Sequence, residues 1–132
     1  MTGVQTCALP IYRQIGRVLD FLEANKLMEN TIVIYSSDQG FFLGENGWFD
    51  KRWMDEVSTR VPLLMQWHGR IAPGSSSDAL VQNIDFAPTL LAAAGVKPKM
   101  PMHGVSLLPL FVADVATEIG RASCRERVFR AV

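Results

Sequence analysis

Cysteine is almost absent from this 132-residue sequence. Its two cysteines, Cys7 and Cys124, both lie in terminal segments that look foreign to the rest of the chain. The segment between them therefore offers no disulfide, no thiolate nucleophile and no cysteine metal site. Histidine is also scarce: His68 and His103 stand in predicted loops without the partner ligands that a metal site requires, so we interpret both as structural.

The sequence has no excess of charge and no long apolar run. Its 13 basic and 13 acidic residues give a formal net charge of zero, so we expect no nucleic-acid surface and no basic membrane patch. No apolar run reaches the roughly 18–20 residues that a membrane span needs, so we predict no membrane span. Hydrophobic residues make up 48% and charged residues 20% of the chain, which is typical of a globular domain.

The two terminal segments resemble in-frame translations of common short-read sequencing adapters. They cover residues 1–11 (MTGVQTCALPI) and residues 118–132, where the resemblance lies in EIGRASCRERV. We interpret both as non-native additions that belong outside fold reasoning. The alternative is a genuine N-terminal arm and a basic C-terminal tail. The intervening residues 12–117 carry nine basic and eleven acidic side chains and are mildly acidic.

Helical and strand patterns alternate in the first half of the chain. Apolar residues recur every three or four positions between Tyr12 and Leu27, which predicts an amphipathic helix packed on one side. Ile32–Tyr35 is a continuous apolar run typical of a strand covered on both faces. Val61–Trp67 is a second predicted strand, Phe41–Asp50 a loop, and Trp53–Thr59 a short helix. Together these elements favour an α/β fold.

A second predicted helix begins at Asp85, whose carboxylate can accept from the free amides of the first turn. It ends at Gly95, a natural helix C-terminus. Lys97–Pro101 is interrupted by prolines and is interpreted as a linker. Gly104–Phe111 is apolar, and we expect it to pack against a region outside this chain.

Asp38 and Gln39 follow the first predicted strand directly. They offer carboxylate and amide oxygens, the hard ligands that calcium or magnesium prefers. α/β proteins place ligands beyond the carboxyl ends of their strands, and Gly40 allows a sharp turn there. The alternative is a capped turn in which Ser36, Ser37 or Asp38 only satisfies nearby amides.

Lys51 lies thirteen residues after Asp38. Its ammonium group can hold a sulfate or phosphate oxygen while charge builds on the leaving group. The alternative is a solvated surface lysine paired with Asp50. Its neighbours Trp48 and Arg52 are further candidates for substrate contacts. The local aromatic residues either line a sugar subsite or pack beneath a long loop; they are Phe41, Phe42, Trp48, Phe49 and Trp53.

Three blocks of the sequence resemble the second half of the catalytic domain of the sulfatase family, in the alkaline phosphatase superfamily. They are Ile32–Leu64, which contains DQGFFLGENGWFDK, Leu80–Val96 (LVQNIDFAPTLLAAAGV) and Gly104–Leu110 (GVSLLPL). The resemblance is nearest to sulfatases of sulfated sugars, such as the N-acetylglucosamine-6-sulfatase and iduronate-sulfatase groups. It implies a partial α/β/α sandwich, with residues 12–96 in the catalytic domain and residues 97–117 beginning the C-terminal region.

The resemblance also implies roles for the site residues. Asp38 and Gln39 match the family's calcium ligands, and Lys51 matches the catalytic lysine that contacts the substrate sulfate. In the family, a formylglycine made from cysteine or serine attacks sulfur. The implied activity is that of a sulfuric ester hydrolase acting on a sulfated small molecule or glycan. The sequence assigns no compartment, although the family suggests a periplasmic or secreted parent.

Several parts of the family's site are missing from the sequence. The nucleophile motif Cys-x-Pro-Ser-Arg is absent, and Cys7-Ala8-Leu9-Pro10 does not match it. The two early aspartates of the calcium shell and the upstream histidine are absent as well. We therefore expect a truncated, inactive fragment of a calcium-dependent sulfatase. The alternatives are a phosphodiesterase or phosphonate monoester hydrolase of the same superfamily, or a non-catalytic protein that binds sulfated sugars.

Overall fold

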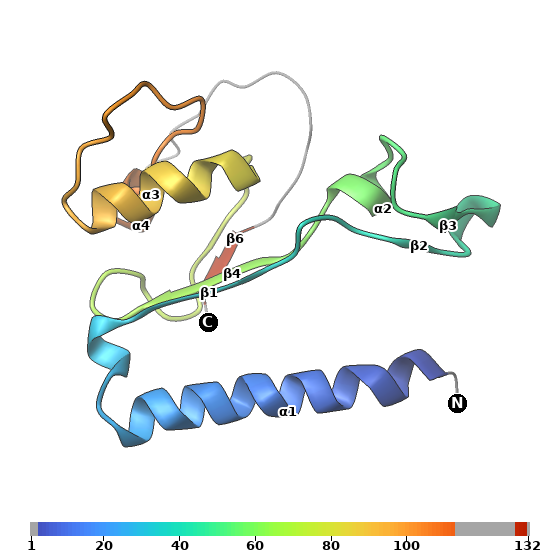
Figure 1. Cartoon of the computed structure of the whole chain (residues 1–132), viewed down its shortest axis with the longest axis horizontal. Coiled ribbons are helices and arrows are strands. Elements are labelled where there is room, and N and C mark those ends of the chain that lie inside the picture. The colour runs from blue at the N-terminus through green and yellow to red at the C-terminus, as the bar shows by residue number, and fades with distance from the viewer. Residues whose placement is uncertain (1–2, 113–128, 132) are drawn as a thin grey trace.

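The computed structural model describes residues 3–112 and 129–131. The interpretation of residues 118–128 as adapter-derived, and Cys124 with it, lies outside this range. The chain is a mixed α/β structure, as the sequence predicted (Figure 1). Its helices are α1 (Gly3–Ala24), α2 (Glu56–Thr59), α3 (Phe86–Ala93) and α4 (Leu108–Val112), with short 3-10 turns η1 (Met28–Asn30), η2 (Glu45–Gly47) and η3 (Asn83–Asp85). Its strands are β1 (Ile32–Ser36), β2 (Phe42–Leu43), β3 (Phe49–Asp50), β4 (Leu63–Trp67), β5 (Ser76–Ser77) and β6 (Phe129–Ala131).

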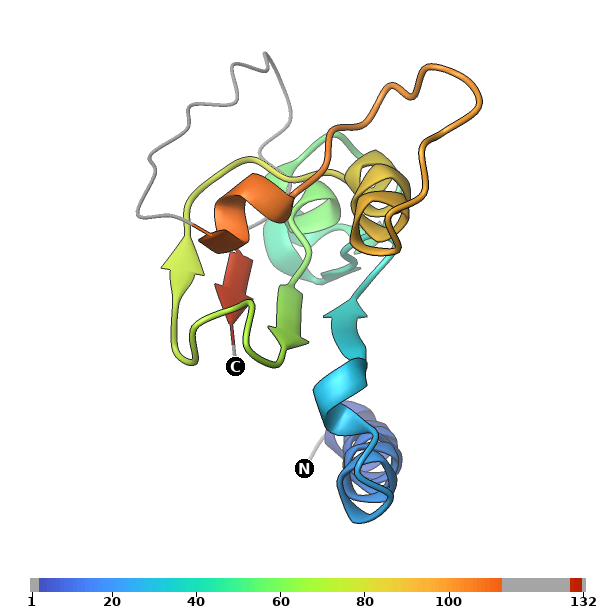
Figure 2. The ribbon, with the colours of Figure 1, turned by 90° about the vertical axis from the view of Figure 1, so that its left-hand side faces the viewer.

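The strands form two sheets. The larger has the order β1-β4-β6-β5, and the smaller is the β2–β3 hairpin (Figure 2). β1 and β4 pair antiparallel, with Ile34 opposite Met65. β6 lies parallel to β4 and antiparallel to β5. The β1–β4 pair is the longest ladder and joins the two strands that the sequence predicted.

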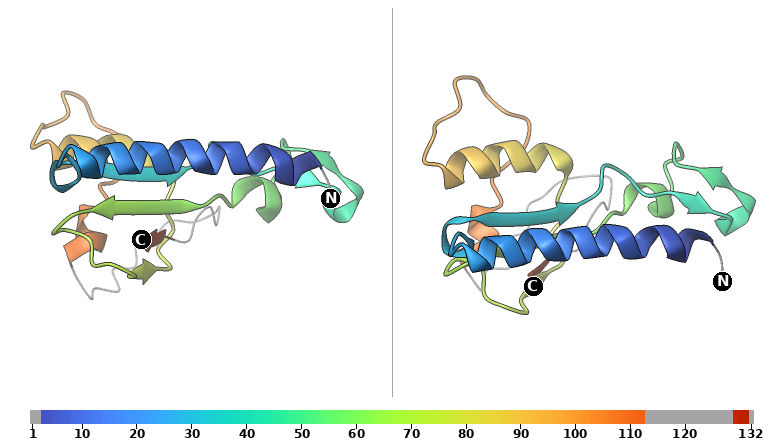
Figure 3. Two further views of the ribbon diagram at one scale, coloured as in Figure 1. Left: turned by 90° about the horizontal axis from the view of Figure 1, so that it is seen from below. Right: turned by 60° about the horizontal axis from the view of Figure 1, so that its bottom comes forward.

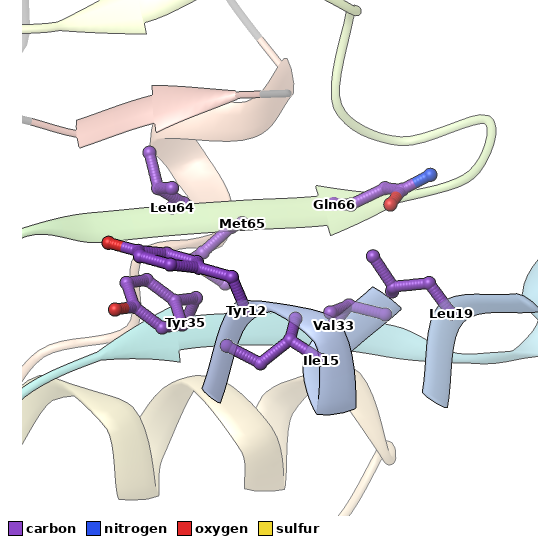
Figure 4. A pocket seen from close by; sticks show the side chains of 8 residues that line it. All are labelled: Tyr12, Ile15, Leu19, Val33, Tyr35, Leu64, Met65 and Gln66. Carbon is purple, nitrogen blue, oxygen red and sulfur yellow. The ribbon is translucent and has the colours of Figure 1, made fainter. Parts of the chain in front are cut away.

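Helices lie on both sides of the β1–β4 pair. Figures 1 and 3 show α1 along one side and α3 with α4 on the other. Because side chains alternate along a strand, Ile34 joins the core on the α3 side while Val33 and Tyr35 face α1. A cavity of about 230 Å³ remains between α1 and the sheet (Figure 4).

Ile32–Tyr35 has a helical layer on each face, as predicted, but the cavity leaves the cover on the α1 side incomplete (Figure 1). The segment is a strand, but none of its residues is fully buried, and Tyr35 is 36% exposed. Apolarity on both faces indicated contact with two layers. α1 supplies only a loose cover on its side, so the side chains there stay partly accessible.

The core lies between the sheet and the α3–α4 layer. Its buried members are Leu63, Met65, Ile71, Val81 and Leu107. Because Leu107 is buried in this core, the expectation that Gly104–Phe111 packs against a region outside this chain is wrong. The N–H of Leu107 donates to Oγ1 of Thr89 in α3 at 2.8 Å, which holds this segment over the core. Leu110 and Phe111 of α4 pack against the same cluster.

Several element boundaries differ from the predicted ones. α1 begins at Gly3, well before Tyr12, and continues through Pro10. Phe41–Asp50, predicted as a loop, contains the β2–β3 hairpin, whose two-residue strands are too short to show a period. The helix predicted over Trp53–Thr59 is confirmed only at Glu56–Thr59. No helix in the described ranges is both long and apolar enough to cross a membrane.

The prediction for the start of α3 is wrong in its detail. Asp85 precedes the helix but makes no side-chain hydrogen bond to the first-turn amides. Its Oδ2 accepts from the N–H of Gln82 and its Oδ1 from the N–H of Val105, each at 2.9 Å. The reason is that η3 runs directly into α3. The Asp85 carboxylate therefore points back to Gln82 and across to Val105, and not to the first turn of α3. The predicted end is confirmed: Gly95 follows the helix with φ +68°.

Candidate functional site

The turn after β1 lies directly against α2. The N–H of Gly40 donates to the carbonyl of Ser58 at 2.8 Å. A Cβ at position 40 would clash with the main-chain carbonyl of Val57. Glycine is therefore required here by the close approach of two backbones, and this contact fixes where Asp38 and Gln39 stand.

Replacing Gly40 by alanine is expected to destabilise the protein by about 1–3 kcal/mol, the range for overpacking against a fixed neighbour. The midpoint of denaturant unfolding measures this loss. Gly16→Ala is the matched control, since no atom lies within 4 Å of the added Cβ in α1. Alanine is a better helix former than glycine by up to about 1 kcal/mol, so this control should not destabilise. Equal midpoints for the two variants would contradict the role of Gly40.

The structure brings the three main predicted site residues together. The Nζ of Lys51 lies 3.9 Å from Oδ2 of Asp38. The carbonyl of Lys51 accepts from Nε2 of Gln39 at 3.3 Å and from Oγ of Ser58 at 2.5 Å. Asp50, the predicted alternative partner, contacts the main chain of Lys51 instead: its Oδ1 accepts from the Lys51 N–H at 2.7 Å.

The Asp38 carboxylate is ionised and accessible. Its side chain is 83% exposed. A hydrogen bond from the Gln39 backbone N–H, and then the positive charge of Lys51, hold the pKa of Asp38 below its ordinary value of 3.8. Ser37 directs its Oγ to the Gln39 carbonyl at 2.9 Å, and Ser36 directs its Oγ to that of Pro62 at 2.9 Å. The Ser37 Oγ also lies 3.4 Å from Oδ1 of Asp38, so the exposed carboxylate already has three local partners: the Ser37 hydroxyl, the Gln39 N–H and the Lys51 ammonium group.

The donor atoms present fit a hard cation in kind. Asp38 offers carboxylate oxygens. Because Nε2 of Gln39 donates to the Lys51 carbonyl, the amide oxygen of Gln39 faces away from that carbonyl. Calcium takes six to eight oxygen ligands, so these two residues supply part of a shell. In the described part of the chain, no three His, Cys, Asp or Glu side chains gather where they could hold a metal ion.

Sequence reasoning missed two residues that position this site. Ser58, only 3% exposed, holds the Lys51 carbonyl. Asn83 donates its Nδ2 to the Asp38 carbonyl at 3.3 Å from η3, 45 positions along the chain. Neither belongs to a local motif, so only the folded chain identifies them.

The aromatic candidates divide by exposure. Phe42 is fully buried, which fits the alternative of packing beneath the loop and not that of a sugar subsite. Trp48 and Trp53 are 45% and 48% exposed, and their ring centroids lie 4.4 Å apart. Arg52, which lies between the two tryptophans in the sequence and directly follows Lys51, is exposed. Trp48 and Arg52 thus remain accessible candidates for substrate contacts.

Sequence comparisons identify the family of the chain that carries this site. The sequence profile of the family described as "N-sulphoglucosamine sulphohydrolase, C-terminal" matches residues 44–126, which include Lys51. The chain belongs to the sulfatase family. This confirms the resemblance inferred from the three sequence blocks.

Curated relatives are sulfatases as well. The N-acetylglucosamine-6-O-sulfatase of Bacteroides thetaiotaomicron is 49% identical over 102 residues, 77% of this chain and 18% of the relative. Human N-acetylglucosamine-6-sulfatase is 39% identical over 98 residues, 73% of this chain and 18% of the relative. Human arylsulfatase K is 41% identical over 96 residues, with the same coverage of 73% and 18%. The chain thus spans less than a fifth of these relatives.

Proposed function

We propose that this chain is the part of a calcium-dependent sulfatase that supplies two metal ligands and the sulfate contact. Hydrolysis of a sulfate ester on a carbohydrate is the proposed activity of the whole enzyme. The observation that carries the proposal is the convergence of Asp38, Gln39 and Lys51 in a chain of the sulfatase family. The relatives named for N-acetylglucosamine 6-sulfate favour a sulfated sugar as the substrate.

The chain's own residues have distinct tasks in this proposal. The carboxylate of Asp38, whose pKa is held below its ordinary value by the Gln39 N–H and by Lys51, and the amide oxygen of Gln39 hold the cation. Calcium, when bound, polarises the sulfate oxygens as a Lewis acid. Lys51 places a positive charge against the sulfate, where it balances the charge that develops on the departing oxygen. Trp48 and Arg52 contact parts of the substrate beyond the sulfated sugar.

The proposal also covers the wider frame. α1 on one side of the sheet, and α3 with α4 on the other, support a partial α/β/α sandwich of the alkaline phosphatase type (Figure 1). Residues 12–96 belong to its catalytic domain, and residues 97–117 begin the C-terminal region. The sequence has no Cys-x-Pro-Ser-Arg motif. No residue of this sequence takes the part of the formylglycine nucleophile. The 132 residues alone should therefore not hydrolyse a sulfate ester.

A chimera tests the proposed activity. The 102 residues that align with the Bacteroides thetaiotaomicron enzyme replace the matching segment of that enzyme. The chimera is expected to release sulfate from N-acetylglucosamine 6-sulfate and to act poorly on N-acetylglucosamine 6-phosphate. The unmodified Bacteroides enzyme, prepared alongside, is the control, and thermal unfolding establishes that the chimera is folded.

Two results would contradict the proposal. Faster hydrolysis of a phosphodiester or of a phosphonate monoester than of the sulfate ester by the same chimera would favour the phosphodiesterase or phosphonate monoester hydrolase alternative. A folded chimera that binds the sulfated sugar without hydrolysing it would favour the non-catalytic binding protein.

A further inference from the structure

Two tryptophans form an exposed pair beside the candidate site. Trp48 ends the turn of the β2–β3 hairpin, and Trp53 follows β3. Their rings meet at an interplanar angle of 52°, and about half of each side chain is open to solvent. We call them the Trp48–Trp53 pair.

The hairpin backbone sets the position of Trp48. Its carbonyl accepts from the N–H of Gly44 and its N–H donates to the carbonyl of Glu45, each at 3.0 Å. The carboxylate of Glu45 accepts from the N–H of Leu43 at 2.6 Å and stiffens the same turn. Gly44 and Gly47 have φ values of +123° and +74° and permit the tight backbone. The Trp48 backbone is thus held in place, while the ring stays accessible.

Among the described residues, core packing does not account for the Trp48–Trp53 pair. Phe42 anchors the hairpin and is fully buried, whereas both tryptophans stay accessible. Exposed tryptophan is costly to leave in water and is enriched where one face of the ring meets a partner. The pair therefore calls for a ligand with an apolar face and polar edges.

Two positive charges adjoin the pair. Arg52 lies between Trp53 and Lys51 in the sequence. Two residues span at most about 7 Å of extended chain, so Trp53 stands close to the proposed sulfate contact. A ligand for this surface combines flat apolar faces with negative charge. A sulfated glycan has both, because pyranose rings expose C–H faces and sulfate groups are anionic.

We propose that the Trp48–Trp53 pair stacks on a sugar ring next to the sulfated residue, and that Arg52 holds an anionic group on that neighbour. This inference rests on the proposed function, because it extends the same site from a single sulfated sugar to an oligosaccharide. The pair then determines specificity for chain length, and Lys51 keeps the sulfate contact.

Tryptophan fluorescence of the 132-residue chain tests the inference. The probe is a heparin-derived tetrasaccharide, and its chemically desulfated form is the comparison. Titration of the sulfated probe is expected to change the emission. Trp48→Ala and Trp53→Ala should each weaken binding about tenfold, which is 1.4 kcal/mol. Trp53→Tyr should restore most of the affinity, because it returns an aromatic ring to the same place.

Trp67 provides the matched control. It is half-buried and packs edge-on against Phe111 in the core, with ring centroids 6.4 Å apart. Trp67→Phe should leave the affinity unchanged. Equal affinity of the wild type and both alanine variants, equal binding of the desulfated probe, or no binding by the wild type would overturn the inference.

The outcomes separate this inference from the proposed function. N-acetylglucosamine 6-sulfate has no neighbouring sugar, so the chimera assay does not depend on the pair. If the chimera releases sulfate but the Trp48–Trp53 pair does not bind the tetrasaccharide, only the inference is refuted. Binding through the pair, combined with an inactive folded chimera, refutes only the proposed hydrolysis.

Discussion

Replacing Asp38 by alanine in the chimeric sulfatase is expected to lower kcat by about 10³-fold or more. The variant removes a carboxylate that supplies both charge and coordinating oxygens to the proposed calcium ion. A bound metal contributes several kcal/mol to stabilising developing charge, and each 1.36 kcal/mol is tenfold in rate. Steady-state assays with N-acetylglucosamine 6-sulfate measure the loss. Calorimetric titration of the variant with calcium should show weakened binding independently of turnover.

Asp78→Ala is the control for this prediction. Asp78 is also an exposed aspartate, but it follows β5, at the opposite edge of the larger sheet from β1. Its removal should change neither kcat nor calcium affinity. Full activity of the Asp38→Ala chimera, or calcium affinity equal to that of the parent chimera, would remove Asp38 from the site.

Replacing Asp85 by alanine should destabilise the 132-residue chain by about 3–5 kcal/mol. Asp85 is only 1% exposed and accepts hydrogen bonds from the N–H groups of Gln82 and Val105. A hydrogen bond to a charged group contributes about 1.5–3 kcal/mol, and alanine leaves both amides unsatisfied in a buried place. Net stabilities are typically 5–15 kcal/mol, so a large fall in the denaturation midpoint is expected.

The two aspartates should separate binding from stability. Asp38→Ala removes an exposed side chain and should leave the unfolding midpoint nearly unchanged. Asp85→Asn, which keeps one carbonyl acceptor, should lose less stability than Asp85→Ala. A midpoint for Asp85→Ala within experimental error of the wild type would show that neither hydrogen bond matters to the fold.

The sequence predicted those elements whose patterns are long enough to read. The amphipathic period indicated α1, and the apolar runs indicated β1 and β4. The β2–β3 hairpin was not predicted, because a two-residue strand is too short to show an alternation of apolar and polar residues. The pairing of β1 with β4 also could not be read locally, because an antiparallel ladder depends on partners some thirty residues apart.

The candidate site shows the same division. The chemistry of Asp38, Gln39 and Lys51 made them candidates, and the resemblance to sulfatases supplied their expected roles; the structure brings the three residues together. The contacts that hold them come from Ser58 and Asn83, which carry no motif of their own. Asp85 was predicted to accept from the first-turn amides of a helix, but η3 precedes α3 directly and the Asp85 carboxylate accepts from Gln82 and Val105 instead.

The fold holds Asp38 and Lys51 by their main-chain carbonyls. Asn83 donates to the carbonyl of Asp38, while Gln39 and Ser58 donate to that of Lys51. Any residue with a compatible backbone would present the same carbonyl. Substitutions that change either side chain therefore leave these carbonyl contacts available, so the proposed chemistry of the site can vary while the fold around it is kept.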